Sequence, residues 1–77
     1  MNENELLEKK LALDEYSKRR FLVKLKLESG DNLYGHIIKV SENTIILRND
    51  RHSIDSFLHI KDITTIIPLS GWEEAAR

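Results

Sequence analysis

Apolar and polar residues alternate with a period of two from Phe21 onward. The apolar side of the first such segment consists of Phe21, Val23, Leu25 and Leu27, and the polar side consists of Lys24, Lys26 and Glu28. Successive side chains of a β-strand point to opposite faces of its sheet, so this alternation predicts a strand with one face in the core.

Further short strands are predicted after this one, separated by polar turns. Residues 29–32 read Ser-Gly-Asp-Asn, in which glycine allows a positive φ and Asp or Asn tolerates one, so the chain is expected to return antiparallel from Leu33. The segments 44–47, 54–60 and 63–67 are expected to supply three more strands. Pro68 is expected to end the last strand because it has no N–H to donate.

Gly35 falls inside the second predicted strand. A glycine there usually marks a sharp bend or the close approach of another backbone, and strongly bent strands are typical of small barrels. Together with the helix predicted before it, the pattern indicates a mainly β chain with one N-terminal α-helix. The expected architecture is a five-stranded, strongly bent, open barrel of the SH3-like kind.

The helix is predicted over residues 1–20. Asn2 can cap it with Glu5 three positions on, and basic residues gather at its end. A broad, imperfect apolar stripe is formed by Leu6, Leu7, Leu11, Leu13 and Tyr16. Such a stripe is expected to pack against the core of the same domain.

A chain of 77 residues is long enough for a single domain only, comprising the helix at 1–20, the barrel at 21–68 and a short tail at 69–77. A domain of this size buries about 60–65% of its unfolded surface. The chain has no cysteine, so self-association is the expected source of further stability. An open barrel has two exposed edges, and head-to-tail pairing of the strand containing Phe57 with strand 63–67 of a neighbour can close into a ring.

The charges nearly cancel, since 12 Lys and Arg residues stand against 13 Asp and Glu residues. Any nucleic-acid site must therefore be a local basic patch. No apolar run approaches the roughly 20 residues of a membrane span, and the charged N-terminus lacks the apolar region of a signal peptide. We expect a soluble cytoplasmic protein without membrane partners.

The usual signatures of enzymes and metal sites are absent from the sequence. His36, His52 and His59 fall on different predicted elements with no pair at helical spacing, so a metal site is not expected. There is no glycine-rich phosphate loop, nucleophile elbow or Cys-His pair. We expect no enzymatic activity and no cofactor.

Two segments of the chain resemble the Sm-like family, and within it the Hfq group of bacterial RNA chaperones. The first has apolar alternation, a turn, a Leu and a Gly two residues later, carried by Leu25, Leu27, Gly30, Leu33 and Gly35. The second, Ile-Thr-Thr-Ile-Ile-Pro at 63–68, is similar to the Ile-Ser-Thr-Ile-Met-Pro ending of Hfq. The likeness covers about two thirds of the chain, and the loop at 51–55 is about two residues longer than its Hfq counterpart.

This resemblance implies a homo-oligomeric ring, a hexamer in Hfq, that binds single-stranded A- or U-rich RNA and promotes RNA annealing or post-transcriptional regulation. It places Lys18, Arg19 and Arg20 at the basic outer rim, where they can meet phosphates. The bare sequence allows an equally good alternative, in which these residues are a solvated helix C-terminus.

The resemblance also implies a proximal RNA-binding face around the pore, and here the chain departs from the family. Asn43 replaces the aromatic residue that stacks on uracil, Glu42 replaces a Gln, and Ile60-Lys61 replaces Lys-His, with His59 in place of a Tyr. Base stacking is worth roughly 1–3 kcal/mol per base, so recognition is expected to be weakened or redirected. His59 and Lys61 remain candidates for contact with a phosphate or a base edge.

On the opposite, distal face, the resemblance places Lys26, Gly30, Asn32 and Tyr34. Gly30 matches the family, whereas Lys26 stands where an aromatic residue is usual and Tyr34 stands where a Gln usually discriminates adenine. Tyr34 is either a replacement stacking platform or an ordinary strand residue with its hydroxyl in water.

Another class of function remains open on the sequence alone. An Sm-like oligomeric scaffold could bind protein partners rather than RNA through one face, the helix or the tail. Trp72, in the tail, is expected either to cover apolar surface beside the barrel or to bind such a partner. A monomeric barrel that recognises DNA or ribosomes is a third possibility.

Overall fold

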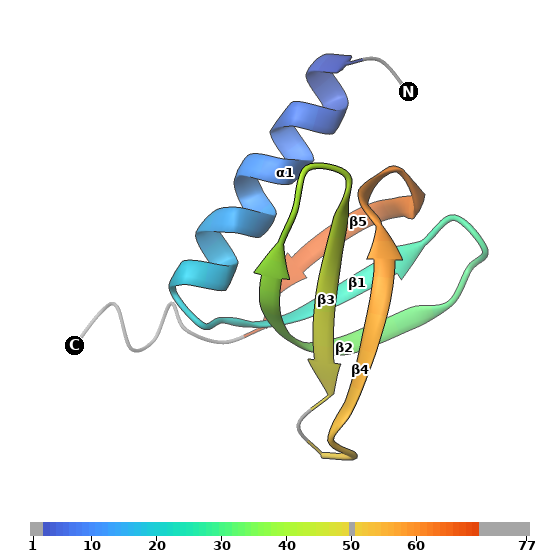
Figure 1. The fold of residues 1–77 in the computed structure, drawn as a ribbon. Coiled ribbons are helices and arrows are strands. Elements are labelled where there is room, and N and C mark those ends of the chain that lie inside the picture. Colours follow the sequence, from blue (N-terminus) through green and yellow to red (C-terminus); the bar gives the residue numbers. More distant parts are fainter. Residues whose placement is uncertain (1–2, 50, 70–77) are drawn as a thin grey trace.

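The computed structural model describes residues 3–49 and 51–69. The elements in chain order are α1 (Glu3–Lys18), β1 (Leu22–Leu27), β2 (Asn32–Val40), β3 (Thr44–Asn49), β4 (Ile54–His59), the 3-10 helix η1 (Ile60–Asp62) and β5 (Ile63–Pro68). The predicted helix followed by five strands is confirmed (Figure 1). Ile60, assigned to a strand by its apolar character, instead begins the 3-10 turn. The capping residue Asn2 and the tail residue Trp72 lie outside the described residues.

All strand pairs are antiparallel, and the sheet has the order β4-β3-β2-β1-β5 without closing. The long strand β2 belongs to both halves of the bent sheet. Residues 32–36 of β2 pair with β1, and residues 36–40 pair with β3. Figure 1 shows β3 and β4 crossing β1 and β5 at a steep angle as a result. The predicted open barrel is confirmed, and β4 and β5 are its two edges.

Gly35 sits at the bend of β2, as its place in the sequence predicted. A Cβ atom at Gly35 would lie 2.2 Å from the carbonyl oxygen of Arg48 on β3, far inside van der Waals contact. The register between β2 and β3 shifts between Ile37 and Lys39, which adds a bulge just beyond the bend. Only a residue without a side chain lets the two backbones come this close.

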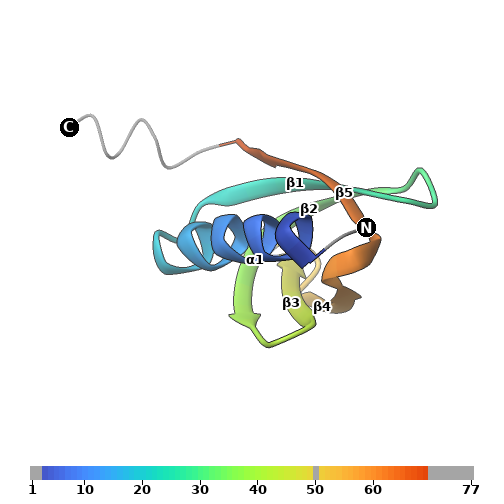
Figure 2. The ribbon, with the colours of Figure 1, turned by 90° about the horizontal axis from the view of Figure 1, so that it is seen from above.

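The core is built from alternate strand residues, one residue of α1 and one residue of η1. Its fully or almost fully buried members are Leu13, Val23, Leu25, Ile37, Ile45, Leu47, Ile60 and Ile63. Figure 2 shows α1 lying between β1 and β5 on one side and β3 and β4 on the other, where it covers the open end of the barrel. Leu6 and Tyr16 also pack against the core.

The prediction for the helical stripe is wrong at two positions. Leu7 and Leu11 are 54% and 60% exposed, so only part of the stripe faces the barrel. With about 3.6 residues per turn, Leu7 and Leu11 lie on a different side of α1 from Leu13 and Tyr16, which pack on the core. Among the described residues, no helix is both long enough and apolar enough to cross a membrane.

The last strand ends where the sequence predicted. β5 stops at Pro68, although the N–H of Leu69 still donates to the carbonyl oxygen of Leu22 at 2.8 Å. Pairing of β5 with β1 therefore extends one residue beyond the proline.

Candidate nucleic-acid interface

The predicted rim residues lie at the C-terminal end of α1, which closes in a Schellman motif. The N–H of Phe21 donates to Tyr16 O at 3.0 Å and the N–H of Arg20 donates to Ser17 O at 3.1 Å. The rings of Tyr16 and Phe21 stack with centroids 5.6 Å apart, which is the apolar contact that accompanies this motif. Arg20 has φ 56°, a left-handed conformation that favours glycine.

The three rim cations differ in their partners. Lys18 forms an ion pair with Asp14 at 3.1 Å, and Arg19 forms one with Glu15, each one helical turn away. Within residues 3–49 and 51–69, Arg20 has no acidic partner. It borders a hollow of about 450 Å³ lined also by Ser17, His36, Ile37 and Ile38. The spacing of four residues between acid and base was the sequence signal for the two ion pairs.

The predicted pore residues are partly brought together. Asn43, His59 and Lys61 line one hollow with Leu6 of α1, whereas Glu42 is exposed on the neighbouring turn and does not line it. The N–H of Ile60 donates to Asn43 O at 2.9 Å, which joins the turn after β2 to the 3-10 helix. The lining has no Phe, Tyr or Trp, so the hollow offers polar groups and an imidazole rather than a large stacking surface.

The predicted distal residues lie on the outward side of the β1–β2 hairpin. Lys26 pairs with Asn32 and Lys24 pairs with Tyr34 across the two strands. The Lys24 ammonium lies 5.8 Å from the centroid of the Tyr34 ring, a cation–π distance, and Tyr34 is 47% exposed. Gly30 has φ 97° in the hairpin turn, a backbone conformation that favours glycine, so its role in this chain is conformational.

Lys24 is a candidate that the sequence reasoning did not select. The alternation in the sequence could have pointed to it, because the period of two places Lys24 on the same side of β1 as Lys26. The rim and pore hollows share no lining residue, so the predicted groups form separate sites.

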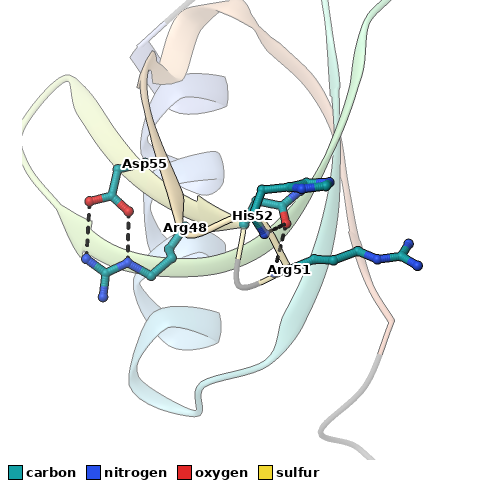
Figure 3. A network of polar contacts seen from close by, with 5 residues as sticks. Arg48, Arg51, His52 and Asp55 are labelled. Carbon is teal, nitrogen blue, oxygen red and sulfur yellow. Dashed lines mark hydrogen bonds and ion pairs between the residues drawn. The ribbon is translucent and has the colours of Figure 1, made fainter.

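The β3–β4 hairpin carries a further polar network (Figure 3). The Arg48 guanidinium donates to both oxygens of Asp55, at 2.8 and 3.1 Å, across paired strands. This hydrogen bonding and the positive charge of Arg48 lower the pKa of Asp55 below its ordinary value. In the described ranges, no three His, Asp or Glu side chains gather as a group that could hold a metal ion.

Both edge strands expose apolar side chains. On β4, Phe57 is 76% exposed and Ile54 is 58% exposed, and on β5, Ile67 is 39% exposed. A β-strand edge with exposed apolar residues is a ready partner for another strand. These edges are therefore candidate contacts between subunits.

Comparison with known proteins identifies the fold. No protein-family model matches the chain, and no curated protein sequence matches it significantly. An Hfq protein from Anabaena sp. aligns at 21% identity and a TM-score of 0.65, over 80% of this chain and 97% of its own. A structure described as the pleiotropic translational regulator Hfq aligns at 16% identity and a TM-score of 0.66, over 74% of this chain and 92% of its own. The chain thus has an Sm-like fold that resembles Hfq.

Proposed function

We propose that this chain is a non-enzymatic RNA-binding protein that works as a ring of identical subunits, six by resemblance to Hfq. The ring binds single-stranded A- or U-rich RNA in the cytoplasm and promotes its annealing or its regulation after transcription. The Sm-like fold supports this proposal, as does the description of one structural neighbour as a translational regulator.

The observation that carries the proposal is the exposure of Phe57 on an open sheet edge. A large aromatic side chain that is 76% exposed leaves apolar surface in water, and burying it in a subunit contact would contribute about 1.5–3 kcal/mol. β4 and β5 lie at opposite edges of the sheet, so pairing between them in neighbouring subunits is head-to-tail. A repeated contact of this kind closes into a ring when the rotation between neighbouring subunits divides a full turn.

Arg20 is the rim residue best placed to bind phosphate. Lys18 and Arg19 each lie beside a carboxylate, which reduces their attraction for a polyanion, whereas Arg20 borders an open hollow. One such cation per subunit is a weak site. Repetition of this site around a ring raises the overall affinity for RNA, because one RNA strand can contact several subunits at once.

The pore is expected to contribute less than the rim. Its hollow lacks the large aromatic platform on which a base could stack, and the exposed Glu42 on the adjacent turn repels a phosphate. RNA binding by this ring is therefore expected to depend on phosphate contacts and to fall steeply as salt rises.

Alanine variants at the rim test the proposal. Replacing Lys18, Arg19 and Arg20 together is expected to weaken binding of oligo-A or oligo-U RNA and to reduce the salt dependence of binding. Arg20→Ala alone should give most of the loss, and the Lys18→Ala, Arg19→Ala double variant should give less. Unchanged affinity and salt slope in the triple variant would reject rim binding.

The protein-scaffold function keeps one specific observation in its favour. Leu7 and Leu11 lie one turn apart on α1 and are both more than half exposed, which suits an apolar contact with another protein. Under this alternative, Leu7→Glu abolishes partner capture while the triple rim variant has no effect on function. RNA binding by the purified ring would favour the first function.

A further inference from the structure

We infer that the β3–β4 loop and Tyr34 form an additional nucleotide-binding site, in which Tyr34 stacks on a base of single-stranded RNA and Arg51 binds the adjoining phosphate. This inference rests on the proposed RNA-binding function. The resemblance placed Tyr34 on the distal face but supplied no role for this loop, and the new element is the pairing of Tyr34 with the basic residues of the loop.

The site is a hollow of about 280 Å³ between the bend of β2 and the loop. Its lining residues are Leu22, Tyr34, Gly35, Asn49, Arg51 and His52. A second hollow on the same hairpin shares Tyr34 and Asn49 with it and continues towards Asn32 and Ile54. The Tyr34 ring therefore borders two adjoining hollows, an arrangement that suits consecutive units of an extended strand.

The sequence of the loop fixes the position of its two basic residues. The side-chain oxygen of Asn49 accepts hydrogen bonds from the backbone N–H groups of Arg51 at 3.0 Å and His52 at 3.3 Å. Asn49 also accepts from the His52 N–H through its carbonyl oxygen, at 3.2 Å. These three hydrogen bonds join Asn49 to the backbone N–H groups of Arg51 and His52, and none of them uses the side chain of either basic residue.

Charge complementarity identifies the occupant. Figure 3 shows Arg51 and His52 on the side of the hairpin away from the Arg48–Asp55 pair. Arg48 is satisfied by a carboxylate, whereas the Arg51 and His52 side chains form no ion pair within the described residues. Lys24 adds a third basic group beside the Tyr34 ring. An aromatic face bordered by basic groups fits the base and phosphate of a nucleotide.

The depth of the hollow depends on Gly35. Because this residue has no Cβ, the backbone of β2 approaches the Arg48 carbonyl and brings Tyr34 and Leu22 next to the loop. The bend that shapes the barrel thus also brings the aromatic residue of one hairpin to the basic residues of the next.

Binding of oligo-A and oligo-U RNA of 18 nucleotides to the full chain tests the site. Arg51→Ala is expected to weaken binding about fivefold or more and to lower the salt slope by about 0.7 for each subunit whose loop contacts the RNA. Arg51→Lys should retain most of the affinity. The matched control is Arg48→Ala, which removes one positive charge from the other side of the same hairpin and is expected to stay within twofold of the original protein.

Substitutions at Tyr34 separate stacking from charge. Tyr34→Phe keeps the ring and should bind nearly as well as the original protein, whereas Tyr34→Leu should bind about fivefold or more weakly. In amide NMR spectra of the full chain, the trinucleotides of A and of U should shift the signals of Gly35, Arg51 and His52.

The possible failures are distinguishable. If Arg20→Ala weakens binding but Arg51→Ala and Tyr34→Leu behave like Arg48→Ala, the RNA-binding function stands and the loop site is wrong. If the original protein binds neither RNA, the proposed function fails and the loop site fails with it.

Discussion

Arg48 and Asp55 face each other across β3 and β4 and are joined by two hydrogen bonds of 2.8 and 3.1 Å. The pair joins β3 to the edge strand β4, and the hydrogen bond from Arg48 is the main reason that the pKa of Asp55 is lowered. A carboxyl group with a lower pKa in the folded state stabilises that state once it is ionised.

The pair therefore predicts a stability difference that depends on pH. The original protein should exceed Asp55→Ala in stability at pH 5–7, above the ordinary Asp pKa of about 3.9, and the difference should shrink as the pH falls below that value through the folded pKa. Urea unfolding at pH 7, 4 and 3, at one fixed protein concentration, measures it. A difference that stays constant down to pH 3 would contradict the assigned role of the charge.

Gly35 should tolerate substitution far less than Gly30. A Cβ at Gly35 would overlap the Arg48 carbonyl oxygen at 2.2 Å, whereas a Cβ at Gly30 meets nothing within 4 Å. Gly35→Ala is expected to destabilise the fold by roughly 3 kcal/mol, as severe steric conflicts do. Gly30→Ala should cost about 1–2 kcal/mol for its left-handed backbone. If urea unfolding shows that the two variants lose the same free energy of unfolding, the structure has room for a Cβ atom at Gly35 and this prediction is wrong.

A substitution at Arg20 should lower RNA affinity without lowering the stability of the fold. Its left-handed backbone at the end of α1 is where glycine is preferred, so Arg20→Gly is expected to leave the melting temperature unchanged or to raise it. RNA affinity should nevertheless fall, since the guanidinium at the rim hollow is lost. A clear drop in melting temperature, or unchanged RNA affinity, would argue that Arg20 has a structural role instead.

Phe57 should be required for assembly and not for folding. Because its side chain is 76% exposed, Phe57→Glu should give a folded monomer, with far-ultraviolet circular dichroism unchanged and a smaller mass in light scattering. Leu7→Glu, which places the same charge on an exposed leucine of α1, is the matched control and should leave the ring intact. A Phe57→Glu protein that still assembles would move the subunit contact elsewhere.

The strands and the bend could be predicted from sequence because local patterns determine them. Alternation at Val23 and Leu25 and the isolated Gly35 each have a direct structural meaning, and the structure confirms them. The exposure of Leu7 and Leu11 could not be predicted in this way. It depends on which side of α1 packs against the barrel, which is a property of the folded domain.

The sequence indicated single residues of the candidate sites, but not which of them the fold brings together. Sequence position suggested Tyr34, but its neighbours Arg51 and His52 come from a different hairpin and meet it only because β2 bends. The pairing of Lys18 with Asp14 was visible as a spacing of four residues, whereas Arg20 was distinguished from its neighbours only by the hollow that it borders.

Native mass spectrometry of the purified protein, alone and mixed with short oligo-A and oligo-U RNA, tests the central claim most directly. The proposed function predicts a ring of six subunits that binds RNA stoichiometrically, with one of the two RNAs preferred. A monomer would contradict the head-to-tail assembly of β4 and β5. A ring that binds neither RNA would contradict RNA binding and favour the protein scaffold.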